Sequence, residues 1–210
     1  MKIKLHILMF LMLPLFTAPP AVRAESASER EHKIKAAFVY NFIKFIDWPQ
    51  EKTPDKNKPI TIGVVGSDTF VKAFDPVKNK QVKGRRLAIK RFGDWDKLKE
   101  SQKKNDSAWK EKLEALKKCR VLFICSCESG KNKVPVEIIK ALKGSGVLLV
   151  GEVPGFLEKG GVINFVTENK KVRFEVNSTS AKRNKLKIRS QLLKLAKRIY
   201  KEEPSEDAKN

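Results

Sequence analysis

Short, continuous apolar runs constrain the fold of this chain more than any other feature. Ile60–Val65, Val121–Cys125 and Val147–Val150 consist mainly of β-branched and aliphatic residues, a composition typical of strands buried on both faces. Other segments, such as Glu31–Ile46, have apolar residues at helical spacing. Strands that alternate with helices predict a mainly parallel sheet flanked by helices. We therefore expect a single three-layer α/β domain over residues 25–201.

The segment Gly155–Asn177 predicts an antiparallel β-hairpin added to this sheet. Two runs of alternating apolar and polar residues lie on either side of Glu168–Lys170, where an asparagine favours a tight turn. Glu175 alternates with the apolar residues of its run, so we expect it on the outer face, paired with Arg173. The Leu-rich segment Lys187–Lys201 predicts a closing helix.

The ends of the chain are expected to lie outside this domain. Residues 1–24 combine a basic start, an apolar stretch over Leu5–Phe16 and a small residue, Ala24, at the expected cleavage point, which is typical of a signal peptide. The apolar stretch is shorter than the roughly 20 residues that span a bilayer, although an uncleaved anchor remains the alternative. Cleavage near Ala24 predicts a periplasmic protein without stable membrane insertion. Residues 202–210 are expected to form a disordered tail.

The net charge of +21 is high, and losing the three basic residues of the signal peptide lowers it to +18. Such a charge is compatible with attraction to phosphate or anionic lipid. The lysines are nevertheless scattered through every segment and are not interleaved with exposed aromatics, which is typical of solvated faces and disfavours a nucleic-acid partner.

The three cysteines lie close together in the sequence. Cys119 and Cys125 flank a predicted strand, so they are too far apart to form a disulfide. One or two buried free thiols are the favoured interpretation, with a Cys125–Cys127 bond or an intermolecular bond as alternatives. His32 is the one histidine outside the signal peptide, so we expect no metal site.

No known catalytic motif occurs in the sequence, and no cofactor is expected. A single glycine, Gly66, follows the first predicted strand, which falls short of the glycine patterns that bind nucleotides. Carboxylates such as Glu152, Glu158 and Glu175 have no acid–base spacing, and we expect them to be solvated or paired with lysines. We therefore expect a protein that is not an enzyme.

Four places in the sequence resemble the YfiR-like family of bacterial periplasmic proteins. They span nearly all of the chain after the signal peptide, and the first and last are specific in combination. They are KIKAAFVYNFIKFIDWP (Lys33–Pro49), PITIGVVG and CRVLFI (Pro59–Gly66 and Cys119–Ile124), GVLLVGEVPGFLEKGGVINFVTENKKVRFEVN (Gly146–Asn177) and SQLLKLA (Ser190–Ala196).

The resemblance implies a non-enzymatic regulator. Members of this family tend to dimerise, and the best-understood ones bind the periplasmic sensor domain of a membrane diguanylate cyclase and hold it inactive, which lowers cyclic di-GMP signalling and biofilm formation. By analogy, the expected contact surface lies around Phe156, Glu158, Phe165 and Glu175, although the two phenylalanines are also compatible with core packing.

Two other functions are compatible with the sequence. A periplasmic small-ligand binding protein would have a deep pocket at the ends of Val65, Cys125 and Val150, because ligands favour the carboxyl ends of parallel strands. An exported hydrolase would require a convergent set of polar catalytic side chains.

Overall fold

The structure is a computed structural model that describes residues 25–48, 57–66, 68–93, 98, 100, 107–125, 134 and 136–201. The expected signal peptide, residues 1–24, and the expected tail, residues 202–210, lie outside this part of the chain. Among the described residues, no helix has the length and apolar character needed to cross a membrane.

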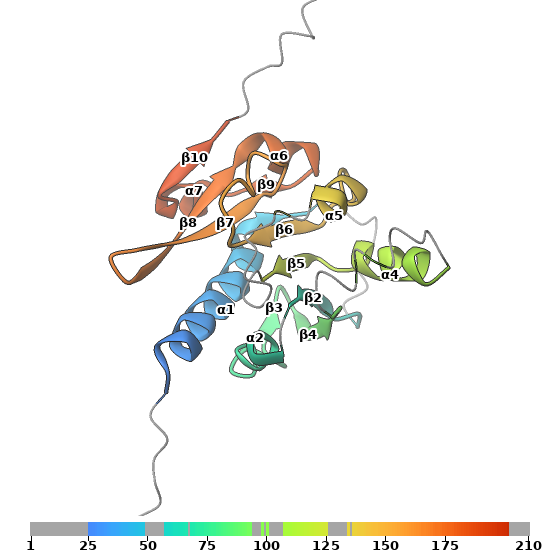
Figure 1. Cartoon of the computed structure of the whole chain (residues 1–210), viewed down its shortest axis with the longest axis horizontal. Coiled ribbons are helices and arrows are strands. Elements are labelled where there is room, and N and C mark those ends of the chain that lie inside the picture. Colours follow the sequence, from blue (N-terminus) through green and yellow to red (C-terminus); the bar gives the residue numbers. More distant parts are fainter. Residues whose placement is uncertain are drawn as a thin grey trace, which may run out of the picture.

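Helices and short strands alternate along the chain (Figure 1). The helices are α1 (Ala27–Phe45), α2 (Asp68–Lys72), α4 (Ser107–Lys117), α5 (Val136–Ala141), α6 (Ser178–Arg183) and α7 (Ser190–Leu195). The strands are β1 (Ile46–Asp47), β2 (Ile60–Val65), β3 (Gln81–Val82), β4 (Arg85–Arg91), β5 (Val121–Ile124), β6 (Leu148–Gly151), β7 (Ile163–Glu168), β8 (Lys171–Asn177), β9 (Lys187–Ile188) and β10 (Arg198–Tyr200).

The main sheet has eight strands within the described residues, in the order β10-β8-β7-β6-β5-β2-β4-β3. Its central pairs, from β7 through β6, β5 and β2 to β4, are all parallel. Antiparallel pairs occur at β7–β8 and at β3–β4, and β1 and β9 form a separate small antiparallel sheet. The predicted α/β class with a mainly parallel sheet and a hairpin is therefore confirmed.

Helices cover both faces of this sheet, as Figure 1 shows. On one face, Phe42 of α1 stacks on Phe165 of β7 with ring centroids 5.7 Å apart, and Phe70, on α2, stacks on Phe123 of β5 at 4.2 Å. Leu122, which precedes Phe123 in β5, points to the opposite face, where α4 and α5 lie. The strands are therefore buried on both sides, as their continuous apolar runs predict.

The hairpin forms where the alternation predicts it. Phe165 of β7 lies opposite Phe174 of β8, and the strands meet at a two-residue turn. Asn169 and Lys170 occupy this turn with φ values of 49° and 60°, which is the left-handed geometry that matches the twist of a tight hairpin. The apolar face of the hairpin packs against α1, so the first and last parts of the domain share one core.

The predicted closing helix over Lys187–Lys201 is wrong in its extent. Only α7 is helical, and short strands lie on either side of it. The amide of Arg189 donates a 2.9 Å hydrogen bond to the carbonyl of Phe45, and that of Lys197 donates a 2.8 Å bond to the carbonyl of Phe174. These long-range backbone bonds hold the flanking residues in extended conformation, which outweighs their helical spacing.

The first helix begins earlier than the spacing of apolar residues predicts, at Ala27 rather than at Glu31. Ser26 and Glu29 form a reciprocal capping pair: the Ser26 hydroxyl accepts from the Glu29 amide at 3.1 Å, and the Glu29 carboxylate accepts from the Ser26 amide at 2.9 Å. Such a pair satisfies two otherwise unpaired backbone donors and starts the helix there.

The described cysteines differ in their redox state. Cys119 is a buried free thiol, as the sequence favours, and burial raises the pKa of this thiol to about 11. Cys125 is disulfide-bonded, which is the alternative that the sequence leaves open for this residue. Cys127 lies outside the described residues.

Candidate functional site: a groove between the first helix and the hairpin

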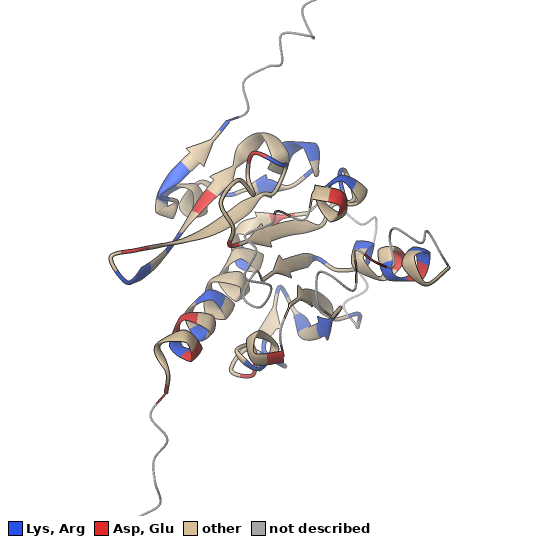
Figure 2. Cartoon of the chain, viewed as in Figure 1, with Lys and Arg blue, Asp and Glu red and all other residues tan. Residues whose placement is uncertain are grey.

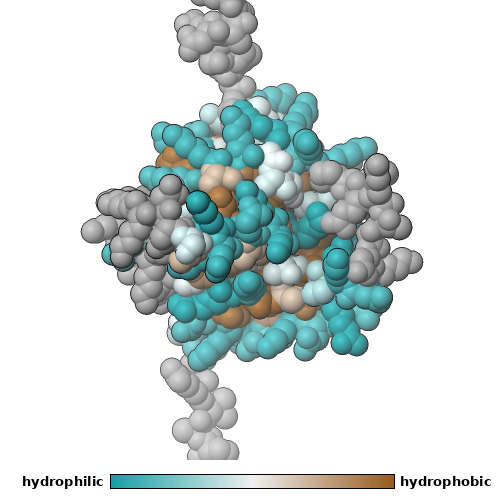
Figure 3. All heavy atoms as spheres, turned by 90° about the vertical axis from the view of Figure 1, so that its right-hand side faces the viewer, coloured by the Kyte–Doolittle hydropathy of each residue, from teal (hydrophilic) through white to brown (hydrophobic). Residues whose placement is uncertain are grey.

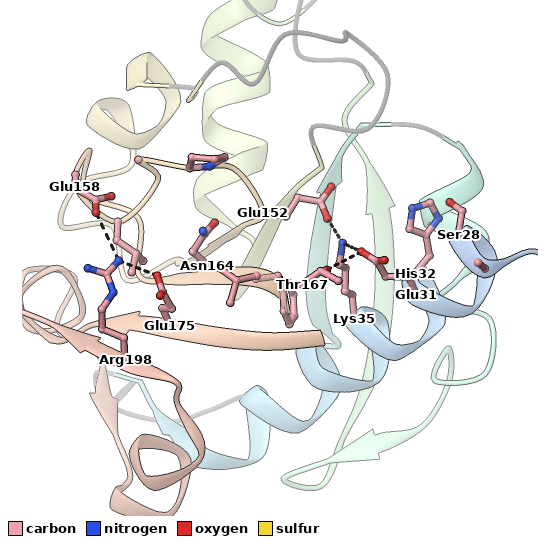
Figure 4. Close-up of a pocket in the computed structure, with 16 residues that line it drawn as sticks. Ser28, Glu31, His32, Lys35, Glu152, Glu158, Asn164, Thr167, Glu175 and Arg198 are labelled. Carbon is pink, nitrogen blue, oxygen red and sulfur yellow. Dashed lines mark hydrogen bonds and ion pairs between the residues drawn. The ribbon is translucent and has the colours of Figure 1, made fainter. Parts of the chain in front are cut away.

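An open groove of about 880 Å³ lies between α1, the loop that follows β6, and the outer strands β7, β8 and β10. Figure 4 shows that polar side chains enter it from all of these elements. Its lining consists of Ala27, Ser28, Glu31, His32, Lys35, Glu152, Pro154, Gly155, Leu157, Glu158, Asn164, Phe165, Val166, Thr167, Glu175 and Arg198.

A buried ion-pair network occupies one end of the groove. Lys35 Nζ lies 2.6 Å from Glu31 Oε1 and 2.6 Å from Glu152 Oε2, and the side chains of Lys35 and Glu152 are only 8% and 5% exposed. The Thr167 hydroxyl donates to Glu31 at 3.3 Å, so the network also reaches β7 (Figure 4). One lysine of α1 thus links the helix to the loop after β6 and, through Glu31, to the hairpin.

The electrostatics of this network follow from its geometry. Burial alone lowers the pKa of Lys35, but the paired carboxylates of Glu152 and Glu31 outweigh it and raise this pKa. The hydrogen bond from Lys35 lowers the pKa of Glu31. Burial lowers the pKa of His32, whose ring meets Phe70 edge-on at 5.1 Å. Lys35 is therefore the main positive charge at this end of the groove at neutral pH.

A second ion-pair network forms the other end. Arg198 Nη2, on β10, lies 2.8 Å from Glu175 Oε2 and 3.6 Å from Glu158 Oε1 (Figure 4). The parallel register places Arg198 directly beside Glu175, and their hydrogen bond raises the pKa of the guanidinium. The expected pairing of Glu175 with Arg173 is therefore replaced by a pairing with a residue of the last strand.

Buried amides hold the wall of the groove in place. The side-chain oxygen of Asn164 accepts a 3.1 Å hydrogen bond from the Val153 amide, and the Asn177 side chain donates a 2.8 Å bond to the Leu157 carbonyl. Both bonds tie the loop after β6 to the hairpin, so Glu152 and Glu158 project from a fixed backbone. Fixed side-chain positions lower the entropic cost of binding a partner.

The groove is acidic although the chain is strongly basic. Its lining contains four carboxylates, two permanent cations and one histidine whose burial favours the neutral form, so its formal charge is −2. The whole chain carries +21. A partner segment with a positive charge is therefore favoured here, whereas most of the surface repels it.

Three of the four residues that the resemblance selected lie together in this groove. Glu158, Phe165 and Glu175 all line it, although Phe165 is only 3% exposed and packs mainly in the core. Phe156 does not reach the groove: it is fully buried, and its ring packs against Gly151 and Gly161, where a β-carbon would overlap it.

Several residues of the groove carry no signal in the sequence. Lys35 lies on an amphipathic helix, where a lysine is ordinarily solvated. Arg198 falls in a segment with helical spacing, so its place beside Glu175 depends on an unpredicted strand. Glu152 is the exception, because a carboxylate expected to be solvated or paired with a lysine is indeed paired with one, Lys35.

The groove differs from the pocket expected of a small-ligand binding protein. It begins just beyond β6, at Glu152, and extends over the hairpin, and neither Val65 nor Cys125 lines it. Residue 67 and residues 126–133, which follow β2 and β5, lie outside the described residues. Within the part of the chain that the structure describes, no group of three or more His, Cys, Asp or Glu side chains is arranged to hold a metal ion.

The fold and this groove define an α/β domain with an open, acidic groove beside its hairpin. The YfiR/HmsC-like family model matches residues 32–197, and the chain belongs to that family. No curated protein matches the sequence.

The fold also occurs in a solved structure of low sequence identity. A conserved domain protein from Vibrio cholerae superposes with a TM-score of 0.53 and 11% identity, covering 80% of this chain and 60% of that chain. An ABC domain from Streptococcus pneumonia in complex with L-Trp gives a TM-score of 0.46 and 12% identity, covering 67% of this chain and 55% of that one. The likeness to the Vibrio cholerae protein concerns the fold alone.

Proposed function

We propose that this protein is an exported, non-enzymatic regulator that binds the periplasmic sensor domain of a membrane diguanylate cyclase and holds the cyclase inactive. Release of the cyclase would then raise cyclic di-GMP. Membership of the YfiR/HmsC-like family supports a regulatory role. The observation that carries the proposal is the convergence of Glu158, Phe165 and Glu175 on one groove from the loop after β6 and from both strands of the hairpin.

The groove suits a protein partner because it is broad, open and polar at both ends. Its two ion-pair networks offer carboxylates to a cationic segment (Figure 4). Repression requires that the regulator bind the inactive conformation of the sensor domain more tightly than the active one. A shift from mostly active to mostly inactive cyclase needs a difference in affinity of about 10⁴-fold.

The direct test measures binding of the purified protein to the periplasmic domains of the diguanylate cyclases from the same organism. Glu175→Lys reverses a charge in the groove beside Arg198 and is expected to abolish binding. Glu168→Lys is the matched control, because Glu168 also lies on the hairpin and pairs with a cation, Lys197 at 3.0 Å, but does not line the groove.

The two variants separate the proposal from its alternatives. Loss of binding with Glu175→Lys, retention with Glu168→Lys, and higher cellular cyclic di-GMP in the Glu175→Lys strain are the expected results. Equal behaviour of the two folded variants would remove the groove from the contact. Unchanged cyclic di-GMP after deletion of the whole gene would refute the repressor function itself.

A periplasmic small-ligand binding protein is the second candidate. The volume of about 880 Å³ lies within the range of small-molecule sites, which is roughly 300–1,000 Å³. A ligand that stabilises the folded protein in a thermal unfolding assay, and that fails to stabilise Glu175→Lys, would favour this function.

A further inference from the structure

A buried amide group in the wall of the groove has one hydrogen-bonding group that the described chain does not use. Asn164, on β7, is 5% exposed and lines the groove. Its side-chain oxygen accepts the 3.1 Å bond from the Val153 amide, and since that amide can only donate, the remaining polar atom of the side chain is the nitrogen, Nδ2. Among the described residues, Nδ2 has no hydrogen-bond acceptor. An unused donor on a buried side chain is costly, so it points to a ligand that carries an acceptor.

The register of the sheet places this donor between carboxylates. Asn164 lies directly opposite Glu175 of β8, and on its other side it is paired with Gly151 of β6, which Glu152 follows. Residues directly opposite one another in neighbouring strands have their β-carbons about 5 Å apart. In Figure 4 the Asn164 amide accordingly lies between the two ion-pair networks of the groove. One hydrogen-bond donor is therefore flanked by negative side chains on two sides.

Each ion-pair network also has one carboxylate that a ligand can reach. The side chain of Glu31 is 36% exposed, although it is paired with Lys35, and that of Glu158 is 43% exposed, although it lies 3.6 Å from Arg198. The two oxygens of a carboxylate together provide about four acceptor positions. A cation from a ligand can therefore bind at either end of the groove while the existing ion pairs stay in place.

We propose that the groove binds an extended, basic peptide segment, with a backbone carbonyl of the segment accepting a hydrogen bond from Asn164 Nδ2 and basic side chains reaching Glu31 and Glu158. Successive side chains of an extended segment point to opposite sides. Two adjacent basic residues can thus extend toward the two ends of the groove while the carbonyl between them faces the amide. A small polycation would satisfy the carboxylates but has no carbonyl for Asn164. The inference rests on the proposed function in that the sensor domain of the partner would supply this segment.

The rest of the described surface does not favour such a segment. Figure 2 shows Lys and Arg on α4, α5 and β10, and the face that carries α4 and α5 is mainly hydrophilic where it is described (Figure 3). The whole chain carries +21, so its overall field repels a basic peptide. Binding of a basic peptide is therefore expected to depend on the residues of the groove.

The test is calorimetric titration of the purified protein with the peptide acetyl-Gly-Lys-Lys-Gly-amide, whose only charges are its two lysines. Asn164→Asp keeps the oxygen that accepts from Val153 but replaces the donor nitrogen with a second acceptor. Asn41→Asp adds the same charge at an exposed position of α1 that does not line the groove.

The two variants separate hydrogen bonding from attraction by charge. Asn164→Asp makes the groove more acidic, so charge alone would tighten binding, whereas loss of the donor is expected to weaken it about tenfold. Asn41→Asp should bind the peptide as the unchanged protein does. Binding by Asn164→Asp that equals or exceeds that of Asn41→Asp, or no binding to the unchanged protein, would overturn the proposal. Thermal unfolding verifies that each variant is folded.

A second pair of variants tests one end of the groove without touching a buried residue. Glu158→Gln removes an exposed carboxylate of the groove and should weaken peptide binding severalfold. Glu114→Gln, which removes an exposed carboxylate beside Lys117 outside the groove, should not. Equal affinities of these two variants would contradict the proposed contact.

Two comparisons define what a failure would mean. Cadaverine, a dication without a carbonyl, should bind more weakly than the peptide, and equal binding would assign the groove to a small polycation and overturn the peptide. Failure of the peptide, with Glu175-dependent binding of a sensor domain intact, would refute this inference alone. Groove-dependent peptide binding without any effect of the gene on cyclic di-GMP would support this inference and refute only the cyclase function.

Discussion

Replacement of Lys35 by methionine is expected to destabilise the domain strongly. Methionine keeps most of the volume of the aliphatic stem but removes the ammonium group that lies 2.6 Å from Glu152, a carboxylate with only 5% of its side chain exposed. Breaking a buried pair by removing one partner typically costs about 3–5 kcal/mol. Small domains have a total stability of about 5–15 kcal/mol, so this change removes a large fraction of it.

Urea unfolding followed by circular dichroism measures this change. With a urea dependence of about 2 kcal/mol per M, a loss of about 3 kcal/mol moves the midpoint down by about 1.5 M. Lys33→Met is the matched control, since Lys33 lies on the same helix and pairs with Glu25 on the surface, with side chains 54% and 42% exposed. An exposed pair contributes about 0–1 kcal/mol, so the control should change little.

A second substitution tests the reason for the loss. Glu152→Gln in the Lys35→Met background removes the buried charge that the first change leaves without its lysine, so it should restore much of the stability. The pKa of Lys35 is raised in the folded state, so its contribution is complete below its ordinary pKa of 10.5 and disappears as the pH rises through the folded value. Equal stability of Lys35→Met and Lys33→Met at pH 7 would refute this reasoning.

Two further predictions concern titratable groups. Burial lowers the pKa of His32, so folding is favoured above its ordinary pKa of 6.5, and stability falls by up to about 1.4 kcal/mol per pH unit as the pH drops below that value. His32→Phe, which retains a ring beside Phe70, should remove this slope in urea unfolding between about pH 6.5 and 5, and an unchanged slope would contradict the assignment. Burial raises the pKa of Cys119 to about 11, so at pH 8 the folded thiol should react with iodoacetamide about a hundredfold more slowly than in urea. Equal rates of alkylation, followed by mass spectrometry, would show that this thiol is accessible.

The strands of the core could be predicted from the sequence because burial acts directly on their composition. The run Ile60–Val65 is apolar on both faces and forms β2, in the middle of the sheet. The hairpin could be predicted equally well, because the alternation of apolar and polar residues and the asparagine at the turn both indicate it. The positions of Glu158 and Glu175 on one groove came from family resemblance and needed the fold to bring them together.

The remainder of the groove depends on contacts that local patterns do not encode. Leucines at helical spacing extend through the final segment, yet pairing with β8 makes Arg198 part of a strand. Lys35 is a lysine on α1 like the solvated ones, and it is buried because the loop after β6 brings Glu152 against it. The glycine-rich sequence around Phe156 is compatible with an exposed loop. In the fold, however, Gly151 and Gly161 lie against its ring, and the residue is buried.

The contacts of α1 also determine when the domain can fold during its synthesis. The helix is made before the strands that it packs against, and its bonds reach across the sequence: Lys35 bonds a residue 117 positions later, and Glu31 one 136 positions later. Asp47, just after the helix, bonds Arg189 across 142 positions. Contacts of such long range slow folding, because the intervening chain must first be ordered. The apolar face of α1 therefore stays uncovered until the hairpin has been made, which exposes the unfinished chain to aggregation and to chaperones for most of its synthesis.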